Sequence, residues 1–282
     1  MRILPIETNL PTLSRYTVLF SKCFPESAKF NPTSLDWLYR QNPDGKVIGF
    51  DAWDGERLAA HYACVPARAS VGGSVVNALL SLNTATDPDY QGQGLFTRLA
   101  QTTYQRAEAE GIDCIFGVAN ANSTPGFLRK LGFQLVEPLQ ARVGVGSLGL
   151  DLNATAEEIQ FERVWSDESI AWRCANPANP VSCRARGDRF QFHAAAVGRL
   201  LSVYSEMPLH RPVAALQRRF FPLLRLYLGL VPTGKCRFRS FVEIPKRFRP
   251  SPLNFIYRSL SKRVERLQPG RIRFSFLDFD AY

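Results

Sequence analysis

The stretch at residues 79–118 constrains the fold more than any other part of the chain. A short apolar run at 78–82 precedes a turn-forming Asp-Pro-Asp segment, and the sequence Gln-Gly-Gln-Gly at 91–94 follows it. Apolar side chains then recur at helical spacing from Phe96 to Ala107, which predicts an amphipathic helix that stops at Gly111. A second apolar run at 112–118 predicts another buried strand. The pattern therefore predicts a strand, a glycine loop, a helix and a strand in succession.

The glycine loop favours an anionic ligand. Gly92 and Gly94 lack a Cβ, so a ligand can approach their backbone closely. The first turn of the following helix offers N–H groups without helical acceptors, together with the positive end of the helix dipole. These features combine into a cradle for a pyrophosphate. The alternative interpretation is a structural turn that uses glycine only for tightness.

The same segment resembles a known family motif. Gln91 and Gly94 match the Q/R-x-x-G-x-G/A signature of the GNAT N-acetyltransferase superfamily, and residues 86–90 resemble the V-x-P-x-Y sequence before it. Asn120 and Ser123, with the run Phe-Leu-Arg-Lys-Leu-Gly-Phe at 127–133, resemble the second motif of that family. The resemblance covers residues 1–140 and keeps the family order throughout.

Two positions depart from the family pattern. Phe96 stands where the signature has glycine or alanine, and it would lie just inside the helix, so the phosphate loop is expected to persist. Leu128 stands where relatives often carry a tyrosine that acts as general acid. Leucine cannot transfer a proton, so any acid must come from elsewhere.

The resemblance implies acetyl-CoA as co-substrate and direct attack of an amine on the acetyl thioester. Backbone N–H groups of 84–86 would hold the thioester end, and Asn120 would contact the pantetheine arm, whereas Asn122 and Ser123 are alternatively caps of the next helix. The residues expected to bind the cofactor are Thr84, Ala85, Thr86, Gln91, Gly92, Gln93, Gly94, Leu95, Phe96, Thr97, Asn120 and Ser123.

The motif does not identify a catalytic base. The central strand offers Ser81 and Asn83 but no carboxylate. Histidine side chains titrate near neutrality, so His61 on a neighbouring strand is the candidate base, and Tyr62 is the candidate acid. Two alternatives stay open: His61 is a partly exposed strand residue without a role, or water relays the proton.

Residues 1–145 are expected to form one GNAT domain, an α/β (α+β) fold with helices flanking a mixed central sheet. Strands are expected at 2–7, 47–53, 58–71 and 133–145, with a hairpin turn at Asp54-Gly55 and a second turn at Gly72-Gly73. Helices are expected at 11–24 and from Asn31 to the turn at 42–45.

The sequence Gly144-x-Gly146-x-x-Gly149 matches a dinucleotide fingerprint, but no helical pattern opens after it. A flexible linker between domains is therefore expected there.

Residues 151–282 are expected to form a second, smaller α+β domain, either a degenerate GNAT-like copy or an unrelated fold. Strands are expected at 190–197, 199–205, 237–244 and 271–278, and helices at 212–221 and 254–267. This half has no loop signature, so it is not expected to bind a second CoA.

Charge is distributed unevenly along the sequence. Residues 1–150 hold 13 Lys+Arg and 13 Asp+Glu, whereas residues 151–282 hold 22 and 12, and 19 of those 22 are arginine. Arginine suits bidentate contact with phosphate or carboxylate, so the acceptor is expected to be a small anionic amine. A solvated basic surface without a ligand is the alternative.

The favoured function is an acetyl-CoA-dependent N-acetyltransferase that acts on a primary amine of a small molecule or cell-surface precursor, such as an amino sugar. The alternatives are a Fem-type transferase that uses aminoacyl-tRNA, and a non-catalytic CoA-binding or peripheral membrane protein with an interfacial helix around 218–221. DNA is not an expected partner, and RNA or a membrane surface is less favoured than a small molecule.

Cysteine content and hydropathy indicate which class of protein this is: metal-binding or not, membrane-spanning or not, oxidised or reduced. The six cysteines form no CxxC pair and have no histidine cluster beside them, so no metal site is expected. The chain shows neither a signal peptide nor an apolar run long enough to span a bilayer. A reduced, cytoplasmic enzyme is therefore expected.

Overall fold

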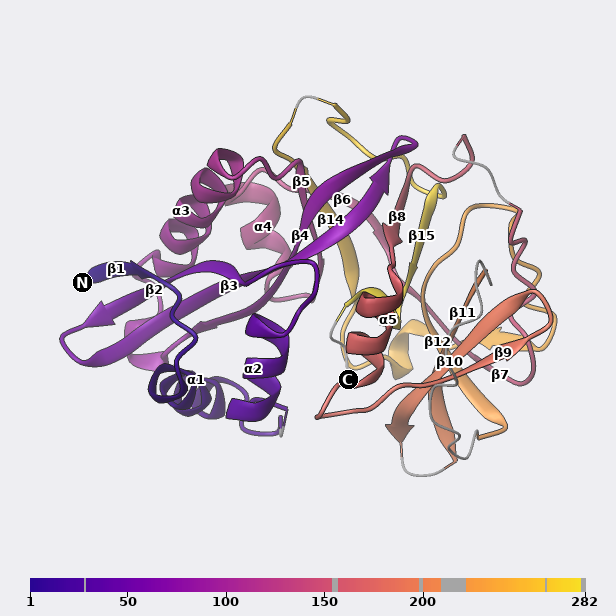
Figure 1. The fold of residues 1–282 in the computed structure, drawn as a ribbon, viewed down its shortest axis with the longest axis horizontal. Helices are drawn as coiled ribbons and strands as arrows, with labels where there is room; N and C mark the ends of the chain where they lie inside the picture. The colour runs from indigo at the N-terminus through magenta and orange to yellow at the C-terminus, as the bar shows by residue number, and fades with distance from the viewer. Residues whose placement is uncertain (28, 154–156, 198–199, 209–221, 262, 280–282) are drawn as a thin grey trace. The chain divides into compact units, whose positions relative to one another are not determined.

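The computed structural model describes residues 1–27, 29–153, 157–197, 200–208, 222–261 and 263–279. The chain forms two compact units (Figure 1). The first comprises residues 1–68, 76–135 and 256–266, and the second comprises residues 69–75, 136–255 and 267–282. This division differs from the expected contiguous segments 1–145 and 151–282, because residues 136–145 lie in the second unit and residues 256–266 in the first.

The first unit is built on a mixed sheet. The β2–β3 pair is antiparallel and the β4–β5 pair is parallel. In sheet order, the strands that lie wholly or partly in this unit are β1 (Arg2–Pro5), β2 (Ile48–Asp54), β3 (Arg57–Val71), β4 (Ser74–Thr86), β5 (Cys114–Ala119), β14 (Asn254–Ser259) and β6 (Gln134–Pro138). The helices are α1 (Leu10–Cys23), α2 (Pro32–Arg40), α3 (Leu95–Ala109) and α4 (Thr124–Lys130). The expected order of elements in a GNAT-like α/β fold is confirmed.

Helices cover both faces of this sheet. Figure 1 shows α3 and α4 on one side and α1 and α2 on the other. Adjacent residues of β3 point to opposite faces, as strand geometry requires: His61 contacts aromatic rings of α1 and α2, whereas Tyr62 contacts those of α3. The core on the α3 side is formed by apolar side chains that include Leu79, Leu95, Leu99, Ile115, Phe127 and Ile256.

Local sequence explains where the first two helices begin. Asn9 and Asn31 occupy the N-cap positions, and their side-chain oxygens accept hydrogen bonds from the N–H groups of Thr12 and Ser34. A proline lies in the first turn of each helix, where its missing N–H is no loss. Both helices start within one residue of the expected positions.

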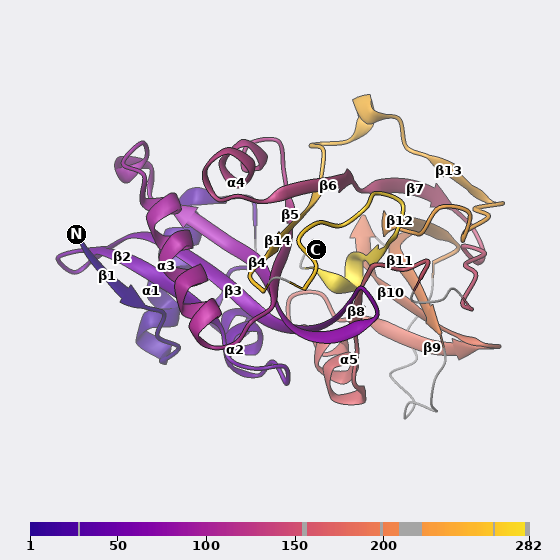
Figure 2. The ribbon, with the colours of Figure 1, turned by 90° about the horizontal axis from the view of Figure 1, so that it is seen from above.

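The expected helix at 254–267 is wrong, because residues 254–259 form strand β14. This strand lies between β5 and β6 in the first unit's sheet (Figure 2). Three consecutive side chains, Phe255, Ile256 and Tyr257, are buried. A strand covered on both faces carries such a continuous apolar run, and periodicity alone does not separate it from a short buried helix.

The expected single strand at 133–145 is divided into β6 and β7 (Gln140–Gly144), which are separated by Leu139. Among the described residues after Gly144, the dinucleotide-like glycine sequence opens no helix, as expected. The flexible linker expected there is wrong. Leu148 is completely buried, and its N–H donates to the Glu206 carboxylate at 3.2 Å, so the segment is packed against the second unit's own core.

The described residues of the second unit form several strands and one α-helix, α5 (Asp167–Cys174). Strands β9, β10 and β11 pair antiparallel, and β11 then pairs parallel with β12. The bounds are β8 (Phe161–Val164), β9 (Ser182–Arg186), β10 (Arg189–Val197), β11 (Leu201–Pro208), β12 (Leu224–Leu230), β13 (Phe241–Glu243) and β15 (Ile272–Ser275). The first unit shows the same succession along the chain: the antiparallel pair β2–β3 is followed by the parallel pair β4–β5.

Three of the four strands expected in the later half are found, as β10, β11 and β15. The fourth, at 237–244, is reduced to the three residues of β13. The expected helix at 212–221 lies outside the described residues. The α+β character expected of this half is present in the part that the structure describes.

A polar cluster lies inside the second unit. The Glu206 carboxylate is buried, accepts from Arg189 at 2.9 Å and is also bonded by the Tyr204 hydroxyl. His193, on the neighbouring strand, bonds the Ser202 hydroxyl through Nδ1 at 3.0 Å. Burial, reinforced by the positive charges of Arg225 and Arg184, lowers the pKa of His193 to about 3.

This lowered pKa predicts a pH-dependent stability. An unfolded histidine takes up a proton near pH 6.5 whereas folded His193 does not, so the folded state loses stability as pH falls from about 6.5 toward 3. We expect a cost of about 1–2 kcal/mol at pH 5, from about 1.4 kcal/mol per pH unit. Thermal unfolding of wild type and His193→Asn between pH 7 and pH 5 measures it: wild type should lose more. Equal losses would contradict the assignment.

Candidate functional site

The parallel strands β4 and β5 diverge at their carboxyl ends. Their ladder runs from the Ala78–Cys114 pair to the Ser81–Gly117 pair and ends there, although β4 continues to Thr86 and β5 to Ala119. The backbone of residues 82–86 is therefore not paired with β5. The carboxyl ends of parallel strands are the usual place for ligands in α/β sheets.

A backbone irregularity marks the point of divergence. Asn83 has φ +49°, a left-handed conformation that is uncommon for a residue other than glycine. Two residues earlier, the Ser81 hydroxyl bonds Tyr62 on the α3 side of the sheet. Strand alternation would place Asn83 on that side too, yet its Nδ2 donates to the Tyr39 hydroxyl of α2 at 3.0 Å. The positive φ therefore turns the Asn83 side chain to the other face.

The glycine loop leads directly into α3. Gly92 and Gly94 have φ +78° and +72°, and Gly94 is the N-cap of the helix. A Cβ at either position would meet no atom within 4 Å, so the conformation, and not crowding, requires glycine. The first helical bond runs from Arg98 N–H to the Gly94 carbonyl. The N–H groups of residues 95–97 thus have no acceptor within the helix and point from its positive end.

The side chains of the first helical turn are divided between core and surface. Leu95 is buried in the first unit's core, and Phe96 packs edge-on against Tyr62 and Phe127, with centroids 6.0 Å and 5.3 Å apart. Phe96, which departs from the family signature, is thus packed against the core beneath the loop. The segment 91–94 before them is exposed.

The segment before the loop is held by a buried carboxylate. Asp87 accepts hydrogen bonds from Arg57 at 2.9 and 3.0 Å, from Lys22 at 3.2 Å and from the N–H of Asp89 at 3.2 Å. Burial alone would raise the pKa of Asp87, but these donors outweigh it and hold the pKa below its ordinary value. The Arg57 guanidinium also lies over the Tyr90 ring at 5.0 Å. Together these contacts fix the entry to the glycine loop.

A protein-family model matches the segment that contains the glycine loop. Residues 9–136 match the model of the acetyltransferase (GNAT) domain. This segment belongs to the GNAT family. No curated protein matched the chain in sequence.

Solved structures of similar fold extend the likeness beyond the GNAT segment. A conserved protein of unknown function from Enterococcus faecalis, described as a probable N-acyltransferase, superposes with a TM-score of 0.59 at 10% identity, over 92% of this chain and 72% of that chain. A GCN5-related N-acetyltransferase from Anabaena variabilis gives 0.57 at 12% identity, over 92% and 73%. The likeness in fold to these proteins therefore extends over most of the chain.

Two of the residues expected to bind the cofactor, Asn120 and Ser123, stabilise the turn after β5 by hydrogen bonds. The Asn120 side-chain oxygen accepts from the N–H groups of Asn122 and Ser123 at 3.0 Å, and the Ser123 hydroxyl bonds both the backbone and the side chain of Asn120. Ser123 is the N-cap residue of α4, but its side chain caps none of the helix N–H groups. The capping expected of Asn122 and Ser123 is thus wrong, because Asn120 organises this turn.

The structure brings the expected CoA-binding residues together at one end of the first unit's sheet. Thr84, Ala85 and Thr86 follow the divergence of β4 from β5, the loop at 91–94 follows β4 through a short 3₁₀ turn (Pro88–Tyr90), and Asn120 follows β5. Their backbones thus surround the carboxyl ends of the same two parallel strands.

His61 does not fit the expected role of a base that contacts the acceptor. It is completely buried, with Nδ1 2.7 Å from the Asp51 carboxylate and Nε2 2.9 Å from the Tyr39 hydroxyl. The alternative of a partly exposed strand residue is equally wrong. This burial has no local pattern in the sequence, because it is produced by aromatic side chains of α1 and α2 that are far away along the chain.

Tyr62 does not fit the role of catalytic acid. Its hydroxyl is buried on the opposite face of the sheet from His61 and is hydrogen-bonded to Ser81 at 2.7 Å and Tyr104 at 2.8 Å. Burial raises its pKa well above the ordinary value. His61 and Tyr62 therefore cannot serve one reacting centre together.

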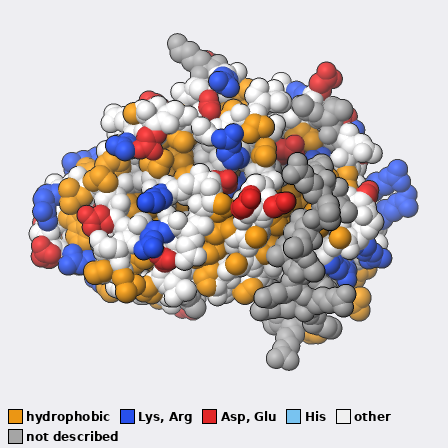
Figure 3. All heavy atoms as spheres, in the orientation of Figure 1, with side chains coloured by type: hydrophobic (Ala, Val, Ile, Leu, Met, Phe, Trp, Pro, Cys, Tyr) orange, Lys and Arg blue, Asp and Glu red, His pale blue; other side chains and the backbone are white. Residues whose placement is uncertain are grey.

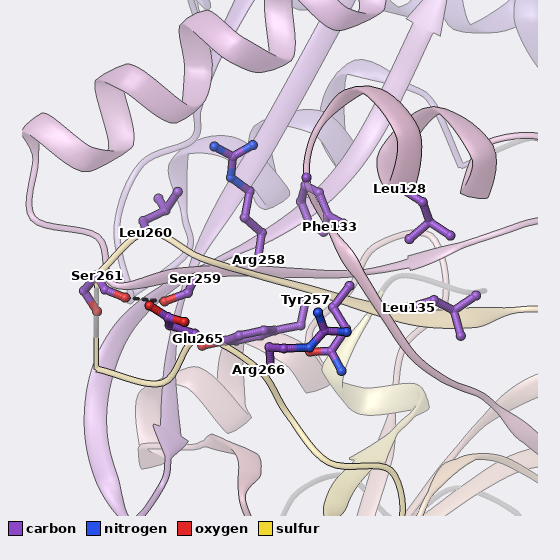
Figure 4. Close-up of a pocket in the computed structure, with 12 residues that line it drawn as sticks. Leu128, Phe133, Leu135, Tyr257, Arg258, Ser259, Leu260, Ser261, Glu265 and Arg266 are labelled. Atoms are coloured by element: carbon purple, nitrogen blue, oxygen red, sulfur yellow. Dashed lines mark hydrogen bonds between the residues drawn. The ribbon is translucent and has the colours of Figure 1, made fainter.

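A separate surface pocket of about 590 Å³ lies in the first unit (Figure 4). It is lined by residues of α4, β6 and β14, among them Leu128, Gln134, Arg258 and Arg266. The N–H groups of residues 260 and 261 bond the carbonyl of Asp113, which precedes β5. The pocket thus lies toward the amino end of β5, away from the divergence of β4 and β5.

The described residues contain no group of three or more His, Cys, Asp or Glu side chains arranged to hold a metal ion. All six cysteines are free. Among the helices of the described ranges, none is long and apolar enough to cross a membrane.

The glycine loop generates a binding prediction. We expect Gly94→Glu to weaken CoA binding at least tenfold, about 1.4 kcal/mol, because a side chain strains the left-handed backbone and a carboxylate opposes the phosphates. Titration calorimetry measures the affinity and should give one CoA per wild-type chain. Gly111→Glu is the matched control: Gly111 has φ +76° and open space but lies at the other end of α3. Unchanged affinity in folded Gly94→Glu would refute the loop assignment.

The buried carboxylate generates a stability prediction. We expect Asp87→Asn to lower the free energy of unfolding by about 1–3 kcal/mol, because Arg57 and Lys22 lose a charged acceptor. Because the pKa of Asp87 is lowered in the folded state, its contribution to the free energy of unfolding is present above about pH 4 and is lost as pH falls through the folded pKa. Thermal unfolding at pH 7 measures the difference. Asp89→Asn, whose carboxylate is 68% exposed, is the control and should cost less than about 1 kcal/mol.

Proposed function

We propose that the protein is an acetyl-CoA-dependent N-acetyltransferase. The observation that carries the proposal is the glycine loop at the N-terminus of α3, beside the diverging ends of β4 and β5, in a segment of the GNAT family. The loop supplies backbone N–H groups and a positive helix end, which suit a pyrophosphate. The part of β4 that extends beyond its ladder with β5 supplies backbone donors for the acyl end.

The residues present support direct transfer. In this mechanism the amine nitrogen forms a bond to the thioester carbonyl carbon, the carbon–sulfur bond breaks, and the nitrogen loses one proton as the CoA thiol is formed. Backbone N–H groups of residues 84–86 would donate to the carbonyl oxygen as it gains negative charge. Preorganised donors of this kind are commonly a large catalytic contribution.

We further propose that the acceptor is a small amine that carries a negative charge, such as a phosphorylated amino sugar. The basic excess supports it in both units: the first holds 16 Lys+Arg against 13 Asp+Glu and the second 19 against 12. Residues 256–266 bring three net positive charges to the unit that holds the site. A field of this sign concentrates anionic substrates near the protein.

Macromolecular partners are less well supported. Figure 3 shows Lys and Arg scattered over the visible face among acidic and apolar side chains, and the described side chains on that face form no single basic patch. The interfacial helix expected around 218–221 lies outside the described residues. Transfer from aminoacyl-tRNA, or sedimentation with anionic vesicles, would favour the alternative functions.

The test follows release of CoA thiol and formation of the acetylated amine by mass spectrometry. Two acceptors are compared at low and high salt: an amino sugar and its phosphate ester. We expect one thiol per acetylated amine, and a preference for the phosphate ester that shrinks as salt screens the charges. Thiol release that does not depend on either amine would overturn the transfer, whereas an equal preference at both salts would overturn only the anionic acceptor.

A further inference from the structure

Four hydrogen-bonded side chains cross the first unit from β2 to β4. Asp51 Oδ1 lies 2.7 Å from His61 Nδ1, His61 Nε2 lies 2.9 Å from the Tyr39 hydroxyl, and Asn83 Nδ2 donates to that hydroxyl at 3.0 Å. The first three side chains are completely buried, whereas Asn83 is partly exposed. The chain therefore connects an inaccessible carboxylate to a side chain at the divergence of β4 and β5.

Donors and acceptors can be matched along this chain. In one such arrangement Asn83 Nδ2 donates to the Tyr39 hydroxyl, that hydroxyl donates to His61 Nε2, and His61 Nδ1–H donates to Asp51. The other oxygen of Asp51 accepts from the Tyr16 hydroxyl at 2.6 Å. Each buried group then has a partner, which makes the chain a rigid support.

This support fixes the Asn83 amide. Because Nδ2 is bonded to Tyr39, Oδ1 is directed away from that hydroxyl, and no described residue donates to it. A neutral amide oxygen accepts hydrogen bonds from an amine. The oxygen belongs to the residue immediately before the N–H groups of 84–86, which the proposed function assigns to the acyl group.

We infer that Asn83 binds the acceptor amine through Oδ1, and that Asp51, His61 and Tyr39 are positioning residues that hold Asn83. The inference rests on the proposed function. It gives the buried histidine a role that its burial allows, since His61 acts through Tyr39 and never contacts the acceptor. It also accounts for an asparagine at φ +49°, where glycine would be unstrained but would lack the amide.

The principal variant is Asn83→Gly, because glycine adopts the left-handed conformation freely and removes only the side chain. We expect its thermal unfolding temperature to be no lower than that of wild type and its CoA affinity, by calorimetry, to be unchanged. The KM for the phosphorylated amino sugar should rise about tenfold, as for loss of one hydrogen bond to a charged group. An unchanged KM in an active Asn83→Gly enzyme would overturn the inference.

Two tyrosine variants separate positioning from general stability. Tyr39→Phe removes the hydroxyl that anchors Asn83, and we expect kcat/KM for the amine to fall about fivefold with CoA affinity unchanged. Tyr16→Phe removes a buried hydroxyl from the same Asp51 on the side away from Asn83, and we expect kcat/KM to be unchanged. Equal losses in both variants would mean that the chain is only structural. Wild type without amine-dependent turnover would refute the proposed function itself, and the inference with it.

Discussion

The site depends on the point at which the β4–β5 ladder stops, the Ser81–Gly117 pair, before either strand ends. At the last pair, Gly117 lies so close to Ser81 that a Cβ there would approach the Ser81 carbonyl to 3.1 Å. Glycine thus lets the two strands pair tightly up to this point. Beyond it, the left-handed conformation of Asn83 turns β4 out of register with its neighbour. The glycine loop, the Asn120 turn and the support behind Asn83 all lie around the carboxyl ends of these two strands.

The parts of the site that were predictable from sequence are those that depend on neighbouring residues. The loop at 91–94, the start of α3 and the hairpin at Asp54-Gly55 follow from glycine conformation and helical spacing, and all three are present. The carboxylate of Asp87 was expected only as part of a turn, because its partners Lys22 and Arg57 come from α1 and β3. Contacts across such distances in the chain leave no local pattern.

Contacts between distant parts of the chain also explain why the expectations for His61 and for residues 254–267 were wrong, and why the conformation of Asn83 was not foreseen. Nothing in the alternation of β3 shows that Tyr16 and Tyr39 will enclose His61, since those residues belong to α1 and α2. A positive φ at asparagine has no sequence signature within a strand. A buried inner strand and a buried helix share an apolar run, so β14 became identifiable only by its neighbours β5 and β6.

The position of β14 has a consequence for synthesis. The chain emerges from the ribosome with β5 and β6 complete by residue 138, but the strand that lies between them is made more than a hundred residues later. Until then those two strands present unpaired edges, which are prone to pairing with other chains. The sheet that leads into the glycine loop is therefore completed only after strands β7 to β13 have been made.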